Sequence, residues 1–330
     1  MIKKYLTLLL TVFIASTALH GQTLENIKID NKLSILNDRA FFLFPTDAVY
    51  EARATNIMSP DPNINEETRI IFDNGDMRLV FFAQELYTLA DNNLFQFVSE
   101  QNIQNAIKTR ILTDREGMLS ILSTPTEYDT TEEAILLNNL IVKTEDNTLF
   151  TITAYINPSA YKIKEEYQKL SETVFGTLTK GTRIMDRSAR KETHKIFGTE
   201  KSLTFSLPDN YCVTVDQKYD FQVFNLHKYR TITEPNWVQI VIYNGRHPSL
   251  VHEEFGLSKN SGQKIKGKFL KQKLDWLFFY MNEYDVYIKE QTVTCDNVAE
   301  GTTFHIAMLS NNKELIDEIT KIVEKIKVTK

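Results

Sequence analysis

The sequence predicts an α+β fold of two tandem modules, each an antiparallel β-sheet with a packed C-terminal amphipathic helix. Three observations lead to this prediction: the length of the chain, its apolar content, and a pattern of strands and helices that recurs in the second half. At 330 residues, the chain is longer than one hydrophobic core usually supports. Its hydrophobic content of 42% and aromatic content of 11% are sufficient for two packed cores.

The first recurring unit is an alternating apolar strand that stops at a proline. In each half, large apolar residues separated by one position precede the proline, as expected of a strand with one buried face. Polar residues follow the proline in both halves and favour a turn. The matching residues are Phe42, Phe44 and Pro45 in the first half and Phe205, Leu207 and Pro208 in the second.

The second recurring unit is an amphipathic helix near the end of each half. Its apolar residues follow an i, i+4, i+7, i+11 spacing, which places them on one face of a helix. We interpret the two units together as evidence for two copies of one module. The apolar positions are Ile163, Tyr167, Leu170 and Val174 in the first helix and Leu315, Ile319, Ile322 and Ile326 in the second.

These units divide the chain into four parts. We expect a signal peptide at residues 1–21, a first module at residues 22–180, a linker at residues 181–195, and a second module at residues 196–330. The linker prediction rests on a polar, charged composition without a sustained apolar period. The first module is acidic and the second slightly basic, within a net charge of −5. Neither module is basic enough to predict nucleic-acid binding.

The elements of each module are predicted from apolar alternation and from turn residues. In the first module, Gly75 lies in a polar turn that predicts a tight hairpin between residues 68–72 and 77–82. Its other expected strands are residues 27–36, 40–44, 118–122, 134–143 and 149–156, with an ambiguous, potentially helical segment at 93–107 and a helix at 158–175.

The second module is expected to follow the same order with fewer residues. Residues 276–281 are apolar on both faces of a strand, so both faces should be covered by other elements. The expected strands are residues 202–207, 221–226, 237–243, 264–281 as an extended pair, 286–294 and 303–309, with a short helix at 247–255 and a closing helix at 312–326.

This order of elements resembles the PsbP-like fold family, which includes the extrinsic photosystem subunit and the Ran-binding Mog proteins. The resemblance rests on the strand-to-proline units named above and on the terminal strand–helix units at residues 149–175 and 303–326. It covers each module in outline, and the tandem arrangement departs from the single-domain members. The resemblance implies a binding or assembly module, and it provides no catalytic residues to carry over.

The N-terminal residues have the features of a secretory signal. Lys3 and Lys4 precede an apolar run and a short stretch of small or polar residues, and we expect cleavage after Gly21. The alternative is an uncleaved anchor, although the run is short for a hydrocarbon core of about 30 Å. No later apolar run is long enough to span a membrane. The sequence therefore predicts an exported protein, periplasmic or extracellular, that is soluble after cleavage.

The chain contains two cysteines, Cys212 and Cys295, and both lie in the second module. In an oxidising compartment such a pair favours a disulfide, which would close a long loop. Two separate buried thiols are the equally weighted alternative.

A row of lysines is the clearest candidate for a binding surface. Lys264, Lys266 and Lys268 alternate with other residues, so a strand would place all three on one face. Such a face favours an anionic headgroup, a glycan or an acidic partner. The alternative, which we weight more heavily, is an edge strand that lysines protect against aggregation.

No catalytic, cofactor-binding or metal-ligating residues are predicted. His247 and His252 are five residues apart, a spacing that separates them on a helix, and they are interpreted as a solvated helix start. The sequence contains no nucleophile elbow and no phosphate-binding loop. The leading hypothesis is an exported, non-enzymatic binding or assembly protein that uses its sheet edges and the groove between the modules. Its expected partner is another envelope or secreted protein; the alternatives are a carrier of a small amphiphile or anion in a sheet–helix pocket, and an unrecognised hydrolase.

Overall fold

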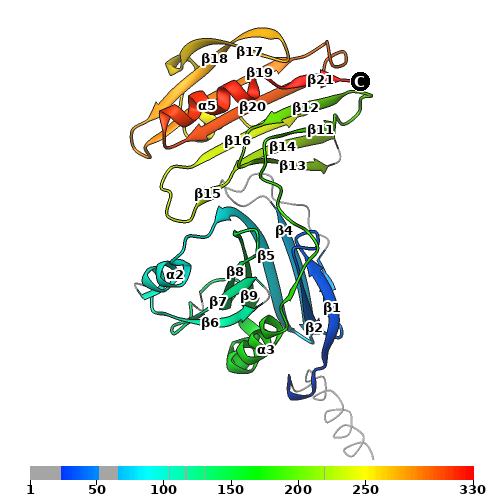
Figure 1. The fold of residues 1–330 in the computed structure, drawn as a ribbon, viewed down its shortest axis with the longest axis vertical. Coiled ribbons are helices and arrows are strands. Elements are labelled where there is room, and N and C mark those ends of the chain that lie inside the picture. The colour runs from blue at the N-terminus through cyan, green and yellow to red at the C-terminus, as the bar shows by residue number, and fades with distance from the viewer. Residues whose placement is uncertain (1–23, 52–65, 104, 116, 130, 219) are drawn as a thin grey trace, which may run out of the picture.

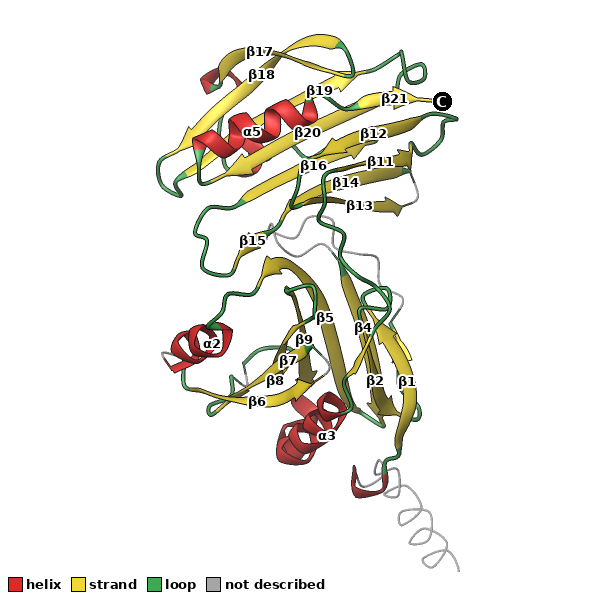
Figure 2. Cartoon of the chain, in the orientation of Figure 1, coloured by secondary structure: helices red, strands yellow, loops and turns green. Residues whose placement is uncertain are grey.

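The computed structural model describes residues 24–51, 66–103, 105–115, 117–129, 131–218 and 220–330, and the predicted signal peptide lies outside them. Strands account for 51% of the structure and helices for 17%. Figures 1 and 2 show a mostly β protein with few helices. The strands of the described residues form four sheets, and all of their pairings are antiparallel except that of β15 with β5. The predicted α+β class, with each module a sheet covered by its helix, is therefore wrong.

The first half contains one large sheet and one small sheet. The large sheet has the order β3-β4-β5-β9-β8-β7-β6, and the small sheet has the order β1-β2-β10. The strands are β1 (Ile29–Ile35), β2 (Ala40–Pro45), β3 (Val49–Tyr50), β4 (Glu67–Asn74), β5 (Met77–Leu89), β6 (Ile107–Arg115), β7 (Met118–Pro125), β8 (Ile135–Lys143), β9 (Thr148–Ile156) and β10 (Thr179–Lys180). The helices are η1 (Leu24–Asn26), α2 (Leu94–Ile103), η2 (Pro158–Ile163) and α3 (Lys164–Gly176).

The second half repeats this division into a large and a small sheet. The large sheet has the order β13-β14-β16-β20-β19-β18-β17, and the small sheet has the order β11-β12-β21. The strands are β11 (Arg190–Lys195), β12 (Ser202–Leu207), β13 (Tyr211–Lys218), β14 (Phe221–Lys228), β15 (Arg230–Thr231), β16 (Val238–Asn244), β17 (Gln263–Phe269), β18 (Gln272–Met281), β19 (Val286–Thr294), β20 (Thr303–Ser310) and β21 (Lys327–Thr329). The helices are α4 (Val251–Glu254), η3 (Lys259–Ser261) and α5 (Lys313–Val323).

The order of strands corresponds between the two halves. In each large sheet, the strand that comes last in the sequence, β9 or β20, lies at the centre, next to the third strand, β5 or β16. The remaining strands follow outward to the far edge in reverse sequence order. The helices α3 and α5 each follow that last central strand. This correspondence concerns topology, and the duplication of the sequence stays a prediction.

One face of each large sheet is covered jointly by the small sheet and the C-terminal helix. In the first half, Phe44 from β2, Phe81 from β5 and Val174 from α3 belong to one buried cluster. In the second half, Phe205 from β12 and Ile319 from α5 share a cluster with β14, β16 and β20. The helix thus covers only part of the face. A second layer of strands covers the rest, which is a physical reason why the predicted class was wrong.

The opposite face of each large sheet is covered in part by a shorter helix. Leu94 from α2 packs with Ile121 from β7 in the first half. Val251 from α4 packs against Leu277 and Phe279 from β18 in the second. Residues 276–281 therefore contribute buried side chains to both faces of the sheet, as predicted.

Several strands were not expected because polar residues interrupt their apolar pattern. β11 lies inside the segment predicted as a linker, and it pairs with β12 along its whole length. β6, β13 and β21 were also missed. Strands half exposed at a sheet edge or on a small sheet need few apolar residues, so their composition resembles that of a loop.

Among the described residues, no helix combines the length and the apolar character needed to cross a membrane.

Candidate functional site

The segment that connects the two halves, residues 181–189, is bonded to the first half. Arg183 donates to both carboxylate oxygens of Glu66, at 2.6 and 2.9 Å. The Met185 backbone N–H donates to Asp146 Oδ2 at 2.9 Å, and Arg187 donates to the Asp146 carbonyl at 2.9 Å. Arg183, Met185 and Arg187, at every second position of the segment, are thus hydrogen-bonded to the first half. The segment is therefore an ordered part of the junction between the halves.

The second half also inserts a loop against the first. β15 pairs in parallel with the end of β5, and the Ile232 N–H donates to the Leu89 carbonyl at 3.0 Å. The ring of Tyr87, from the first half, stacks on His227 with centroids 3.7 Å apart and planes 4° apart. Tyr87, His227 and Tyr229 are all buried. The two halves therefore share a packed junction.

A buried ion network lies in the first half beside this junction. Arg39 is 2% exposed, and its Nε lies 2.9 Å from Glu85 Oε2, while its Nη1 lies 3.5 Å from Asp146 Oδ2. Burial acts to raise the pKa of Asp146, but hydrogen bonds from Thr144 and Met185 and the charge of Arg39 outweigh it and lower the pKa to about 2. Glu85 is fully buried, and burial raises its pKa to about 7 despite Arg39.

The raised pKa of Glu85 predicts a pH dependence of stability. Between about pH 4.5 and 7, the folded state binds a proton at Glu85 that the unfolded state does not, so the free energy of unfolding falls as pH rises. The fall is expected to be on the order of 2 to 3 kcal/mol. Urea unfolding at several pH values checks this: the stability difference between wild type and Glu85→Gln should shrink as pH rises through this window.

The control for this prediction is Glu133→Gln, which changes an exposed carboxylate in the same half. Its stability difference from wild type should stay nearly constant over the same range. A constant difference for Glu85→Gln as well would contradict the prediction.

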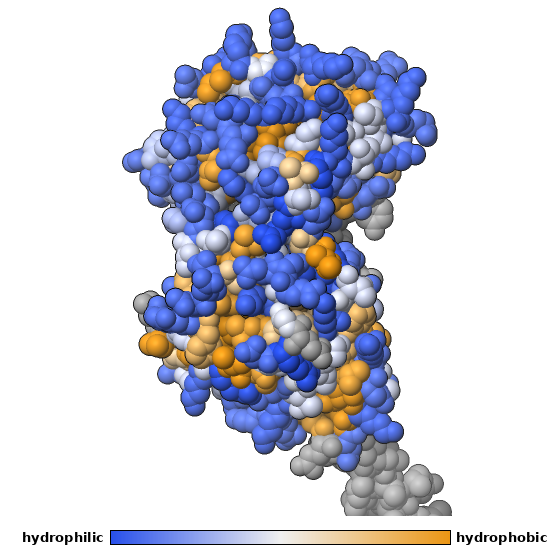
Figure 3. All heavy atoms as spheres, viewed as in Figure 1, coloured by the Kyte–Doolittle hydropathy of each residue, from blue (hydrophilic) through white to orange (hydrophobic). Residues whose placement is uncertain are grey.

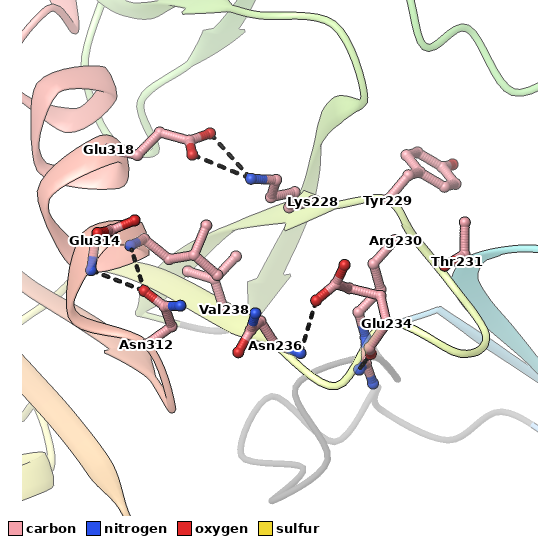
Figure 4. A pocket seen from close by; sticks show the side chains of 11 residues that line it. Lys228, Tyr229, Arg230, Thr231, Glu234, Asn236, Val238, Asn312, Glu314 and Glu318 are labelled. Carbon is pink, nitrogen blue, oxygen red and sulfur yellow. Dashed lines mark hydrogen bonds and ion pairs between the residues drawn. The ribbon is translucent and has the colours of Figure 1, made fainter.

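A hollow of about 380 Å³ lies beside the junction, next to the start of α5 (Figure 4). Lys228 Nζ lies 3.1 Å from both carboxylate oxygens of Glu318, and Arg230 donates to the Glu234 carbonyl at 2.6 Å. The cationic side chains are thus bonded to acceptors of the hollow itself, which gives no specific support to a carrier of small anions. The lining residues are Lys228, Tyr229, Arg230, Thr231, Glu234, Asn236, Val238, Asn312, Glu314, Leu315 and Glu318.

The two histidines of the predicted solvated helix start lie in different environments. His247 is exposed, whereas His252 is buried and bonds through Nδ1 to Glu290. His305 approaches the other oxygen of Glu290 through Nε2 at 3.3 Å. Burial acts to raise the pKa of Glu290, but hydrogen bonds from His305 and the His252 backbone lower it. The carboxylate attaches α4 to the sheet, and the solvated interpretation is wrong for His252.

Within the described residues, no group of three or more His, Cys, Asp or Glu side chains has the arrangement of a metal site.

Both cysteines are free and buried, in different clusters. Cys212 lies at the junction with Tyr87 and Tyr229, and Cys295 lies in the core of the second half. The structure therefore has the two separate thiols that were the alternative to a disulfide. Burial raises the pKa of Cys212 and also that of Cys295, in the latter case to about 11.

We expect both thiols to be unreactive in the folded protein, because they are buried and protonated. At about pH 8, a thiol reagent should modify neither Cys212 nor Cys295 within minutes in buffer, and both after unfolding in denaturant without a reductant. Fewer than two reactive thiols after unfolding would contradict this, since a disulfide would then be present.

The lysine row, defined as Lys264, Lys266 and Lys268, lies on β17 at the edge of the second large sheet. All three lysines are exposed. They occupy every second position of β17 and pair with every second residue of β18, without a register shift, so the three side chains share one face. Among the described residues, Lys266 is the one lysine of the row in an ion pair, with Asp275 at 2.9 Å, and its side chain is still 91% exposed. The row therefore presents its positive charge to solvent.

A shallow hollow of about 740 Å³ lies along the same edge. Glu324, which follows α5, reaches this edge and accepts a hydrogen bond from the Lys268 backbone N–H at 3.2 Å. The hollow is lined by Lys266, Gly267, Lys268, Lys273, Leu274, Asp275 and Glu324.

Sequence reasoning singled out the lysine row but missed the junction. Tyr87 and His227 are far apart in the chain, and neither belongs to a motif. Arg39 lies in the turn between β1 and β2, Glu85 lies on β5, and neither belongs to a motif. No local signal marks such a pair, since only the packing of the two halves brings the groups together.

The comparisons with known proteins were negative: no protein-family model matches this chain, and no curated protein matches it significantly. The resemblance to the PsbP-like family stays a prediction.

Proposed function

We propose that this protein is an exported, non-enzymatic binding protein that recognises an acidic protein partner through the lysine row. The observation that carries the proposal is the geometry of this row. Lys264, Lys266 and Lys268 project from one face of an edge strand, with their charge largely unpaired. A cluster of like charge on a rigid strand attracts an oppositely charged surface and increases its rate of association.

Titration with a fluorescent oligoglutamate tests the proposal. We expect binding that weakens steeply with salt, because exposed charges are screened over about 10 Å at 0.1 M. The variant Lys264→Glu/Lys266→Glu/Lys268→Glu should lose at least about tenfold in affinity, a change of about 1.4 kcal/mol.

The matched control is Lys313→Glu/Lys321→Glu/Lys325→Glu, which makes the same charge change at exposed positions around α5 of the same half. It should lower the affinity by no more than about threefold, since only long-range attraction is altered. Equal losses in the two triple variants would overturn the proposal, because net charge alone would then explain the binding.

A further inference from the structure

We infer that β17 binds an extended acidic segment by strand addition, so that the partner becomes an eighth strand of the second large sheet. This inference rests on the proposed function and specifies its partner. Strand addition uses main-chain hydrogen bonds for affinity and alternate side chains for specificity. The edge at β17 has the hydrogen-bonding register, the charge and the length that this mode requires.

The register shows which backbone groups face outward. β17 and β18 are joined by a two-residue turn, and Phe269 opposite Gln272 closes the hairpin. A two-residue hairpin closes with a hydrogen-bonded pair, and such pairs alternate with non-hydrogen-bonded ones. The residues of the lysine row are therefore in the non-hydrogen-bonded positions, and their N–H and C=O groups point away from β18.

Glu324 provides independent support for this register. Its side chain accepts a hydrogen bond from the Lys268 backbone N–H at 3.2 Å, so this N–H points away from β18. The same carboxylate oxygen lies 3.4 Å from Trp276 Nε1. A Cβ added to Gly267 would lie 2.6 Å from this oxygen, so the carboxylate packs closely against the strand. Glu324 thus occupies one end of the edge and leaves Lys264 and Lys266 for a partner.

The two faces of β17 favour a partner strand in which acidic and apolar residues alternate. In an antiparallel pair, residues directly opposite each other have side chains on the same face. Partner residues opposite Lys264 and Lys266 would therefore favour glutamate or aspartate. The other face of β17 carries Ile265, which is partly buried and packs against the core cluster of this half, so the intervening partner residues would favour apolar side chains.

The lysine row can both prevent self-association of this edge and favour the addition of an acidic strand. A second copy of β17 would place lysine against lysine, so the row disfavours self-association. An acidic strand would instead place carboxylates opposite the lysines, so the charges would attract. The other edge strands of the two large sheets are less suitable: β6 has a bulge between Ile111 and Thr113, β3 has two residues, and β13 carries no row of like charge.

Three synthetic peptides test the inference. The first is an eight-residue peptide of alternating glutamate and valine. The second has N-methyl groups on the glutamate amides, which would face β17, and the third has them on the valine amides, which would face solvent. All three have the same charge. We expect the first and third to bind with similar affinity and the second to bind at least about tenfold more weakly, since its edge cannot pair.

The peptide results separate this inference from the proposed function. Equal binding of the two methylated peptides would overturn strand addition while leaving charge-based recognition intact. Binding of none of the three would overturn both.

A variant of the protein gives a second readout. Lys266→Pro removes the lysine charge and one outward backbone N–H, at an edge position where proline is tolerated. Lys266→Ala removes the same charge but keeps the backbone N–H. We expect Lys266→Pro to bind the unmethylated peptide at least about fivefold more weakly than Lys266→Ala, with unchanged circular dichroism. Equal binding by the two folded variants would count against strand addition.

Discussion

Replacing Arg39 by methionine is expected to lower the free energy of unfolding by about 3 to 5 kcal/mol above pH 7, where Glu85 is ionised in the folded protein, because the substitution strands a buried carboxylate. The Arg39 guanidinium lies 2.9 Å from Glu85, whose side chain is fully buried. It also approaches Asp146 and donates to Thr148. Water cannot replace these interactions at a buried site, so Glu85 must either remain charged without a partner or bind a proton. Denaturant unfolding measures the loss.

Two further variants identify the cause. Replacing both Arg39 and Glu85 by methionine should restore at least half of the lost stability, because no unpaired charge remains at Glu85. The control Arg78→Ala breaks the Arg78–Asp73 ion pair, whose side chains are about half exposed, at 50% and 53%. It should cost less than about 1 kcal/mol. If the double variant were no more stable than Arg39→Met, lost packing would explain the effect instead.

Replacing Gly181 by alanine is expected to cost about 3 kcal/mol or more, because the new methyl group would collide with backbone atoms. A Cβ at this position would lie 1.9 Å from the Asp38 carbonyl oxygen and 2.4 Å from the Arg39 carbonyl carbon. The chain cannot move away freely, since the Arg183 N–H donates to the same Asp38 carbonyl at 3.0 Å. We expect a lower melting temperature together with a loosened junction, measured as faster hydrogen exchange at residues 181–189.

The matched control is Gly176→Ala at the end of α3. A Cβ there meets no atom within 4 Å. Alanine also has a higher helix propensity than glycine, so this variant should be neutral or more stable by up to about 1 kcal/mol. Similar losses at Gly176 and Gly181 would show that the steric argument is wrong.

Much of the strand pattern could be predicted from local sequence. The alternation around Phe42 and Phe44 predicts β2, and the glycine turn at Gly75 predicts the hairpin of β4 and β5. The periodic residues Tyr167 and Ile319 likewise predict α3 and α5. These features depend on neighbours within a few positions, so local patterns carry enough information for them.

The fold class could not be predicted in the same way. The six residues of β11 are polar and read as a linker, yet they form a strand because β12 provides a pairing edge. His252 was interpreted as solvated, because its partner Glu290 lies 38 positions away and only the sheet brings α4 to it. Each error arises where a distant segment supplies the missing hydrogen bonds or burial.

The lysine row separates what the sequence by itself determined from what only the tertiary structure decided. The alternation of Lys264, Lys266 and Lys268 determined that the three side chains share a face, because strand geometry has a period of two. Their place at an open edge depends on the order of the strands in the sheet. The outward direction of their backbone groups depends on the hairpin register. Both properties arise from pairing between segments, so no stretch of β17 could have revealed them alone.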